Sequence, residues 1–491
     1  MSIIHIEHGI ARHPDWRMAT PIDLDIQEGE QIAIVGDNAA GKSRLVEVIV
    51  GHYPLLQNEV QYCFGKGDKR LVSENLKYLS FRDSYGEQDG TYYYQQRWNQ
   101  HDIDQDTPTA GELLEKAFAG QTSLKGKLCK MFHLENLLDK YIISLSSGEL
   151  RKFQLTRALV KEPKVLILDN PFIGLDAPTR DFLKELLATL IQETGMTVIL
   201  VLSKTDEIPS FVTHVLPIQN LHLCAKKTRE AFEKEQLTIP SPMLNEKKRD
   251  WILQLSKKNT QNNIDGDSEE NEILNFQHVS IRYGKRTILK DLSWIVHQGE
   301  HWALSGENGS GKSTLLSLVC ADNPQGYACD IRLFGRKRGS GESIWEIKKR
   351  IGYVSPEMHR AYLKDLPAID IVASGLNDSI GLYCRPKPEQ RVICQTWMDI
   401  FGIKDIADRT FLKLSSGEQR LCLLARAFVK DPELLILDEP LHGLDMKNRT
   451  LVKEVIETFC QRPEKTLIMV THYQEELPPC INHSMWLDKQ N

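Results

Sequence analysis

The chain has 491 residues, of which 41% are hydrophobic and 26% are charged, the proportions of an ordinary globular protein with room for two or three domains. Lysine and arginine number 61 against 67 acidic residues. The net charge of −6 excludes a global basic field that would attract nucleic acid or anionic lipid, so nucleic acid is not indicated as a partner.

The ten cysteines are scattered, with no Cys-x-x-Cys pair and no Cys/His cluster at metal-ligand spacing. This pattern argues against a zinc or iron–sulfur site and suits a reducing compartment. The amino terminus lacks a signal-peptide pattern, and apolar runs such as 196–202 fall short of the ~20 residues that span a bilayer. We therefore predict a cytoplasmic protein, which would lie peripheral to the inner membrane if it serves a membrane process through a partner.

Four motifs recur in one order, which indicates a tandem duplication. They are a glycine-rich loop, a Leu-Ser-Ser-Gly-Glu segment, a strand that ends in aspartate and a Gly-Leu-Asp segment. The first pair lies 270 positions apart and the others 269, at Lys42 and Lys312, 145–149 and 414–418, Asp169 and Asp438, and 174–176 and 443–445. We predict domains at 1–224 and 272–491, joined by a polar linker at 225–271.

The linker and one insertion each leave two interpretations open. Segments 256–263 and 265–270 are too polar to bury an ordered core, so we expect flexibility there. Residues 251–255 form either a short helix that docks on the first domain, which we favour, or a partner-binding segment. Aromatic residues at 92–98, within the insertion 83–108, either pack a small helical subdomain, which we favour, or stack on a ligand or nucleic acid.

Each copy places a glycine-rich loop between an apolar strand, at 31–35 or 301–305, and a helix. A G-x-x-x-x-G-K-S match requires this context. The backbone N–H groups of such a loop wrap a β-phosphate at the amino terminus of the helix. The predicted phosphate-binding residues are Gly36, Asn38, Gly41, Lys42 and Ser43 in the first copy and Gly306, Asn308, Gly309, Gly311, Lys312, Ser313 and Thr314 in the second.

Buried strands are predicted to deliver Asp169 and Asp438 to the carboxyl edge of each sheet. Oxygen ligands suit Mg²⁺, because this small cation is hard. We predict one ion held by Asp169 with Ser43 and another held by Asp438 with Ser313.

The copies differ at the residue that follows the acidic strand. Glu439 can accept a proton from an attacking water, whereas the amide of Asn170 cannot. His472, after the next strand, is predicted to contact a γ-phosphate, and the first copy has Ser203 there. The second site is therefore predicted to hydrolyse and the first to bind but hydrolyse poorly. The first loop also carries Ala39 in place of a glycine, which would strain a left-handed turn.

These residues resemble the ATP-binding cassette (ABC) ATPases over nearly the whole chain. The resemblance implies an α/β fold with two P-loop NTPase domains in tandem, each with a mixed or parallel sheet core and a helical subdomain. It also implies two ATP molecules with Mg²⁺ at an intramolecular head-to-tail interface. The Leu-Ser-Ser-Gly-Glu segments look like the family signature, so Ser146 and Gly148 would complete the second loop's site, and Ser415 and Gly417 the first's.

An aromatic residue upstream of the loop stacks on adenine in this family. Tyr283 fits that position, and the first copy has His13 there with Trp16 nearby. Members of this family have a glutamine shortly after the strand predicted at 351–354. This chain has Pro356 there and Phe81 at the matching place in the first copy, so coupling to a membrane partner would need other residues.

More narrowly, 324–355 resembles the ModF-type, molybdenum-associated group, also called photorepair proteins, and so does 208–212 in the first half. This resemblance implies an ATPase that couples cassette closure to a partner, with an inner-membrane permease for molybdate or another oxyanion as the first candidate. The alternatives are a soluble cassette protein that acts on a ribosome or on DNA, and a nucleotide-gated scaffold. Residues 336–338 form either a solvated basic turn, which we favour, or a site for an acidic partner.

Overall fold

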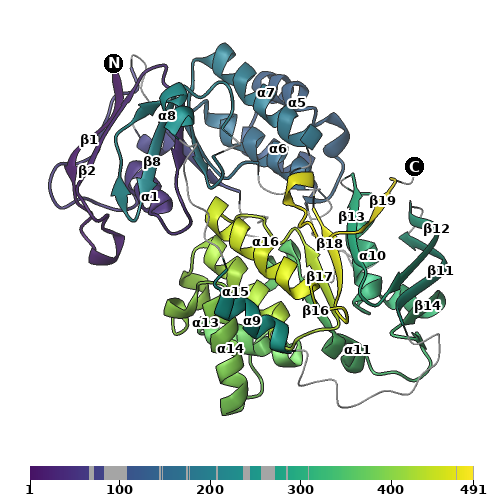
Figure 1. Cartoon of the computed structure of the whole chain (residues 1–491). Helices are drawn as coiled ribbons and strands as arrows, with labels where there is room; N and C mark the ends of the chain where they lie inside the picture. Colours follow the sequence, from purple (N-terminus) through teal and green to yellow (C-terminus); the bar gives the residue numbers. More distant parts are fainter. Residues whose placement is uncertain are drawn as a thin grey trace. The chain divides into compact units, whose positions relative to one another are not determined.

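The computed structural model describes residues 1–65, 71–81, 108–142, 145, 147–172, 175, 177–205, 208–235, 244–255, 271–283, 286–307, 309–471 and 473–489. The chain divides into two compact units, 1–240 and 241–491 (Figure 1). Each unit contains one sheet with a parallel core, one antiparallel sheet and a set of helices. The predicted α/β tandem fold is confirmed.

The first unit contains two sheets, whose strands are β1 (Ser2–Gly9), β2 (Ile22–Gln27), β3 (Ile32–Val35), β4 (Gln61–Tyr62), β5 (Leu76–Ser80), β6 (Val165–Asp169), β7 (Thr197–Leu202), β8 (His214–Gln219), β9 (His222–Leu223) and β10 (Lys227–Thr228). The central sheet has the order β10-β8-β3-β7-β6-β5, and its strands from β8 to β5 run parallel. The smaller sheet, β2-β1-β4, is antiparallel. Strand β6 is apolar and fully buried up to its final aspartate, as predicted for a parallel strand covered on both faces.

The second unit repeats this plan with β11 (Glu272–Tyr283), β12 (Arg286–His297), β13 (His301–Gly306), β14 (Asp330–Leu333), β15 (Arg336–Lys337), β16 (Ile351–Val354), β17 (Leu434–Asp438), β18 (Thr466–Val470) and β19 (His483–Leu487). Its parallel sheet has the order β16-β17-β18-β13-β19. This order matches β5-β6-β7-β3-β8 of the first unit. Its antiparallel sheet is β12-β11-β14-β15.

The helices cover both sheets in each unit. Those of the first unit are α1 (Lys42–Val50), α2 (Val72–Asn75), α4 (Ala110–Phe118), α5 (Thr122–Phe132), α6 (Ser147–Ala158), α7 (Ala177–Thr194) and α8 (Arg229–Glu235). Those of the second are α9 (Glu246–Gln254), α10 (Lys312–Val319), α11 (Ile344–Arg350), α12 (Pro356–Ala361), α13 (Ala368–Ser374), α14 (Pro388–Ile400), α15 (Ser416–Phe428) and α16 (Met446–Cys460). Among the described helices, none combines the length and apolar character that a bilayer crossing requires.

The helix predicted at 251–255 exists as part of α9, but the favoured docking partner was wrong. Ile252 is fully buried in the core of the second unit, and Trp251 meets Trp397 edge-to-face with ring centroids 5.5 Å apart. Figure 1 shows α9 beside the helices of that unit. The Trp251 indole packs there against an aromatic cluster around Trp397. The local sequence does not indicate which domain provides this contact.

The remaining linker and insertion predictions divide between described and undescribed residues. Strand β10 and helix α8, which open the predicted linker, belong to the first unit. Segments 256–263 and 265–270 lie outside the described residues, as do the aromatic residues at 92–98.

The basic residues at 336–338 form ion pairs with acidic residues of their own unit. Arg338 is buried, forms a 2.8 Å ion pair with Glu342 and lies over the ring of Tyr327. Arg336 and Lys337 are exposed and pair with neighbouring acids. These contacts support the structural interpretation that the sequence favoured, except that Arg338 is not solvated.

Candidate functional site

Both glycine-rich loops follow a central strand and lead into a helix, as predicted. Gly36 and Gly306 each lie against a neighbouring strand of the sheet. A Cβ on Gly36 would lie 2.3 Å from the Ile218 carbonyl oxygen of β8, and a Cβ on Gly306 would lie 2.5 Å from the Leu487 carbonyl oxygen of β19. Only glycine fits such a backbone approach. The following helices α1 and α10 begin at Lys42 and Lys312.

The two loop lysines fold back over their own loops. The Lys42 ammonium donates to the carbonyl oxygens of Gly36 and Asp37 at 2.6 and 2.9 Å, and Lys312 repeats both bonds with Gly306 and Glu307 at the same distances. Each ammonium therefore lies beside the amino end of a helix, where an anionic phosphate is favoured. Ser43 and Ser313 are the second residues of these helices, and Thr314, next to Ser313, is buried.

The left-handed turns that the sequence predicts in the loops are present. Ala39 has a φ of 61° and the matching Gly309 a φ of 80°, while Gly41 and Gly311 have values of 111° and 102°. An L-residue in this region costs about 1–2 kcal/mol because its Cβ crowds the following carbonyl. The expectation that Ala39 is strained is confirmed, and Asn38 lies in the same loop.

The acidic strands end at the carboxyl edge of each parallel sheet. Asp438 is buried at the end of β17, and its register partner on β18 is Val470. Asp169 pairs in the same way with Val201, and its Oδ2 accepts a 3.1 Å bond from the Tyr78 hydroxyl. Burial and the Asp169 charge raise the pKa of Tyr78, so this hydroxyl remains a donor.

Glu439 and Asn170 occupy equivalent backbone positions with different side chains. Their φ values are 49° and 50°, respectively. The Glu439 backbone N–H donates to the Val470 carbonyl oxygen, and that of Asn170 donates to the Val201 carbonyl oxygen, both at 2.8 Å. The Asn170 amide donates to Asp169 at 2.8 Å and accepts from the Ser203 backbone N–H at 3.2 Å. The geometry of the second copy is therefore preserved in the first, without the carboxylate.

Sequence analysis missed a partner of Glu439. The Nδ1 of His442 lies 2.8 Å from Oε2 of Glu439, and both side chains are 17% exposed. The first copy has Ile173 at the matching position in the sequence. The spacing of three residues was the available signal, because the turn after β17 brings such a pair together.

A buried arginine fixes the strand end that carries these acids. Arg420, on α15, donates to the carbonyl oxygens of Asp438 at 2.8 Å, Glu439 and Pro440. Burial lowers the pKa of Arg420 to about 10 although both acids oppose this, so its charge persists at neutral pH. In the first unit, Arg151 makes a related bond to the Pro171 carbonyl oxygen at 2.9 Å.

The signature segments lie at the amino ends of α6 and α15. Ser415 caps α15: its hydroxyl accepts from the backbone N–H of Glu418, and the Glu418 carboxylate accepts from the Ser415 backbone N–H at 2.7 Å. Gly417 is buried in α15 and Gly148 in α6, where a Cβ would come within 2.9 Å of the Thr179 side chain.

The two candidate adenine platforms are built differently. In the second unit, the Tyr283 hydroxyl accepts a 2.9 Å bond from the Asn323 amide. In the first unit, Trp16 stacks on Tyr53, with centroids 4.2 Å apart and planes 7° from parallel, and His13 lies tilted against Trp16 at 4.9 Å. Tyr53 occupies the position of Asn323, so an aromatic stack replaces a hydrogen bond there.

Three predicted site residues, Ser146, Asn308 and His472, lie outside the described residues. Of the two residues that replace the family's glutamine, Phe81 is buried beneath Arg151, whose guanidinium carbon lies 5.6 Å from the ring centroid. Pro356 begins α12.

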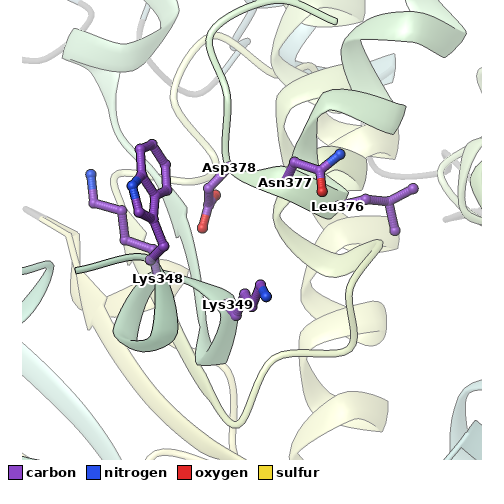
Figure 2. Close-up of a pocket in the computed structure, with 6 residues that line it drawn as sticks. Lys348, Lys349, Leu376, Asn377 and Asp378 are labelled. Carbon is purple, nitrogen blue, oxygen red and sulfur yellow. The ribbon is translucent and has the colours of Figure 1, made fainter. Parts of the chain in front are cut away.

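A surface cavity of about 200 Å³ lies away from the phosphate loop of the second unit. Figure 2 shows it between Lys348 and Lys349 of α11 and the segment 376–378. Trp345 also lines it and is 59% exposed. Helix α11 leads directly into β16.

Comparison with known proteins agrees with the arrangement of both units. A family model described as ABC transporter matches residues 19–173 and 289–442. The ABC transporter ATP-binding protein ModF of Escherichia coli is 38% identical over 99% of this chain and 96% of its own length. An uncharacterized ABC transporter ATP-binding protein of Schizosaccharomyces pombe is 31% identical over 95% of this chain and 94% of its own length.

Solved structures with the same fold include the archaeal ribosome recycling factor aABCE1 in complex with the stalk protein aP1. That structure has a TM-score of 0.54 at 19% identity and covers 98% of this chain and 87% of its own. A model of ribosome-bound archaeal Pelota and ABCE1 has a TM-score of 0.60 at 17% identity, with 91% and 70% covered. At these identities, the likeness shows the fold alone.

We expect opposite stability effects from exchanging the loop residues. Ala39→Gly should raise the free energy of unfolding by up to about 1 kcal/mol, because relief of a left-handed alanine exceeds the entropy cost of a new glycine. Gly309→Ala should lower it by a similar amount. Urea denaturation of both variants measures the change, and equal signs for the two substitutions would contradict the strain argument.

We expect His442 to act as a positioning residue for Glu439. His442→Ala should lower kcat for ATP by roughly 10- to 100-fold with little change in KM, because the carboxylate loses the group that orients it. His442→Gln, which keeps an N–H, should recover part of the rate. His278, which lies 2.8 Å from Asp291 on an exposed surface, provides the control, and its alanine variant should keep full activity. Equal losses in both alanine variants would refute the role of His442.

Proposed function

The chain belongs to the ABC transporter family of ATP-binding proteins, and we propose that it is an asymmetric tandem ATPase. In this proposal, the site around Lys312 and Asp438 binds and hydrolyses ATP, and the site around Lys42 and Asp169 chiefly binds it. The observation that carries the proposal is the pair Glu439 and Asn170. These two residues share one backbone geometry, but only the carboxylate can accept a proton from water.

The described residues fit an ATP–Mg²⁺ ligand in each unit. A loop lysine, a helix amino end, a serine hydroxyl and an aspartate at the end of a buried strand are the donors and acceptors that a triphosphate and a hard cation need. When bound, Mg²⁺ supplies positive charge against the β- and γ-phosphates. Ser313 and Asp438 would hold it in the second unit, and Ser43 and Asp169 in the first.

In the second unit, the proposed chemistry depends on Glu439. Its carboxylate would take a proton from the attacking water while the loop N–H groups and Lys312 hold the phosphates. His442 would orient this carboxylate, and His472 would contact the γ-phosphate. Asn170 and Ser203 supply neither function in the first copy.

We further propose that ATP joins the two cassettes head to tail. Family resemblance supports an arrangement in which Ser146 and Gly148 complete the second loop's site while Ser415 and Gly417 complete the first's. The position of Ser415 and Gly417 at the amino end of α15 supports it, because the dipole of a helix favours an anion at that end. Hydrolysis at the Glu439 site would then reopen the pair.

The partner that we propose is a membrane permease, with molybdate or another oxyanion as cargo. The name of the relatives, ABC transporter ATP-binding protein, supports a permease. The cavity of Figure 2 offers an exposed indole and two lysines, so the docked permease segment would combine an apolar side chain with an acidic one.

The asymmetry can be tested by exchanging the residues that follow the acidic strands. Glu439→Gln should lower ATP turnover by about 10²–10⁴-fold and trap ATP, because the proton acceptor is lost. Asn170→Glu should leave turnover unchanged or raise it by up to about twofold through a second active site. Steady-state turnover with bound nucleotide counted gives both results, with exposed Glu389→Gln as the control. An unchanged rate in Glu439→Gln would favour a nucleotide-gated scaffold instead.

The permease proposal predicts separate effects on docking and catalysis. Trp345→Ala and Lys349→Glu should abolish co-purification of a membrane protein from detergent-solubilised membranes, while the ATPase rate of the purified protein stays the same. Lys247→Glu, on α9, is the control because this exposed lysine lies outside the cavity. Recovery of ribosomes or DNA alone would reject the permease.

A further inference from the structure

Three side chains that commonly ligate metals meet in the second unit, far apart in the sequence. They are His301 at the start of β13, Cys460 at the end of α16 and Cys480 before β19. Their ligand atoms all lie within 4.8 Å of one another, and His301 and Cys460 are buried. Spacing in the sequence does not indicate this cluster, because its three members come from separate segments of the chain.

The fold does not require these residue types. The first unit repeats the local framework: the backbone N–H of Gln31 donates to the Thr213 hydroxyl at 2.9 Å, as that of His301 donates to the Asn482 side chain. The Gln31 amide donates to the Met196 carbonyl oxygen at 3.2 Å. The positions of the two cysteines are occupied there by Ile191 and Phe211.

The His301 ring is in an unusual environment for a buried imidazole. Its Nδ1 lies 3.1 Å from the Cys480 carbonyl oxygen, and its Nε2 lies 3.2 Å from that of Lys465. A neutral ring carries one N–H, so one nitrogen lone pair faces an oxygen that offers no proton. In a metal-bound histidine, one ring nitrogen donates to a backbone carbonyl and the other binds the cation. His301 would therefore keep one of its two carbonyl contacts and exchange the other for the metal.

The two thiols lie close enough to interact. The sulfur atoms of Cys460 and Cys480 lie within 4.8 Å of each other. The Glu457 carboxylate, one turn before Cys460, accepts a 3.0 Å bond from the Cys480 backbone N–H and thereby holds the loop against α16. Cys480 is partly exposed, which provides a path from solvent.

We propose that His301, Cys460 and Cys480 form a binding site for a thiophilic cation of the Zn²⁺ type. Two sulfurs and one imidazole nitrogen match the ligand preference of zinc, at bond lengths of about 2.3 and 2.0 Å. Small side-chain movements bring ligand atoms within 4.8 Å of one another to these lengths. As two Zn–S bonds form, two thiol protons leave to solvent, so binding weakens at low pH.

The proposed site lies at the opposite end of β13 from the phosphate loop, because His301 begins that strand and Gly306 ends it. The metal would therefore lie away from the bound nucleotide. It would join α16, the loop before β19 and the start of β13, three segments that are distant in the sequence.

Metal titration of the full-length chain tests the site without nucleotide. The protein is purified with a thiol reductant, stripped with EDTA, and titrated with Co²⁺ and then Zn²⁺. We expect about one ion per chain, with thiolate-to-cobalt charge-transfer absorption that Zn²⁺ abolishes. Cys460→Ser, Cys480→Ser and His301→Gln should weaken binding by at least about tenfold. His301→Gln installs the residue that the first unit folds with, so it guards against misfolding.

Cys394→Ser, which removes a buried thiol elsewhere in the same unit, is the matched control and should retain the absorption band. A band that persists in the Cys460→Ser and Cys480→Ser variants, or Co²⁺ binding without any thiolate band, would overturn the proposal. So would an isolated protein that retains no metal and is lighter by two hydrogen atoms, since the cysteines would then form a disulfide.

Discussion

The buried guanidinium of Arg420 is the constraint on which the second site depends. It donates to the carbonyl oxygen of Asp438, the last residue of β17, and to that of Glu439, whose backbone conformation is left-handed. Such a conformation costs free energy and persists only where surrounding contacts fix it. Each bond from a charged donor contributes about 1.5–3 kcal/mol, so three of them can hold the strained turn. Because Arg420 belongs to the helix that carries the signature segment, the turn and that helix are mechanically linked within one unit.

Duplication of this framework explains how the two units can share a fold and differ in chemistry. The order of five parallel strands, the first and last loop glycines and the backbone hydrogen bond of the residue after the acidic strand are the same in both units. In the first unit, the Asn170 side-chain amide donates to the Asp169 carboxylate and accepts from the Ser203 backbone N–H, so both ends of the amide are hydrogen-bonded. A side chain satisfied in this way stabilises the turn without needing to accept a proton. The backbone geometry is therefore the same in the first unit, where an amide takes the place of the carboxylate.

The second unit also differs at the far end of its sheet and along its surface. His301 and two cysteines replace a glutamine and two apolar residues that pack well in the first unit. Helix α9 adds Trp251 and Ile252 to the core of the second unit alone. These differences all lie in the unit that contains Glu439, which is the unit that we propose to hydrolyse ATP.

The duplication, the strand–loop–helix units and the acidic strand ends can all be predicted from the sequence, because they depend on local patterns that repeat at a fixed spacing. The substitution of Asn170 for Glu439 and the strain at Ala39 can be predicted as well, since both follow from residue type and turn geometry. The core that contains Trp251, the burial of Arg338 and the contact between His442 and Glu439 became known from the folded structure. The same is true of the meeting of His301, Cys460 and Cys480, because contacts between distant segments depend on how strands and helices pack, which no local periodicity encodes.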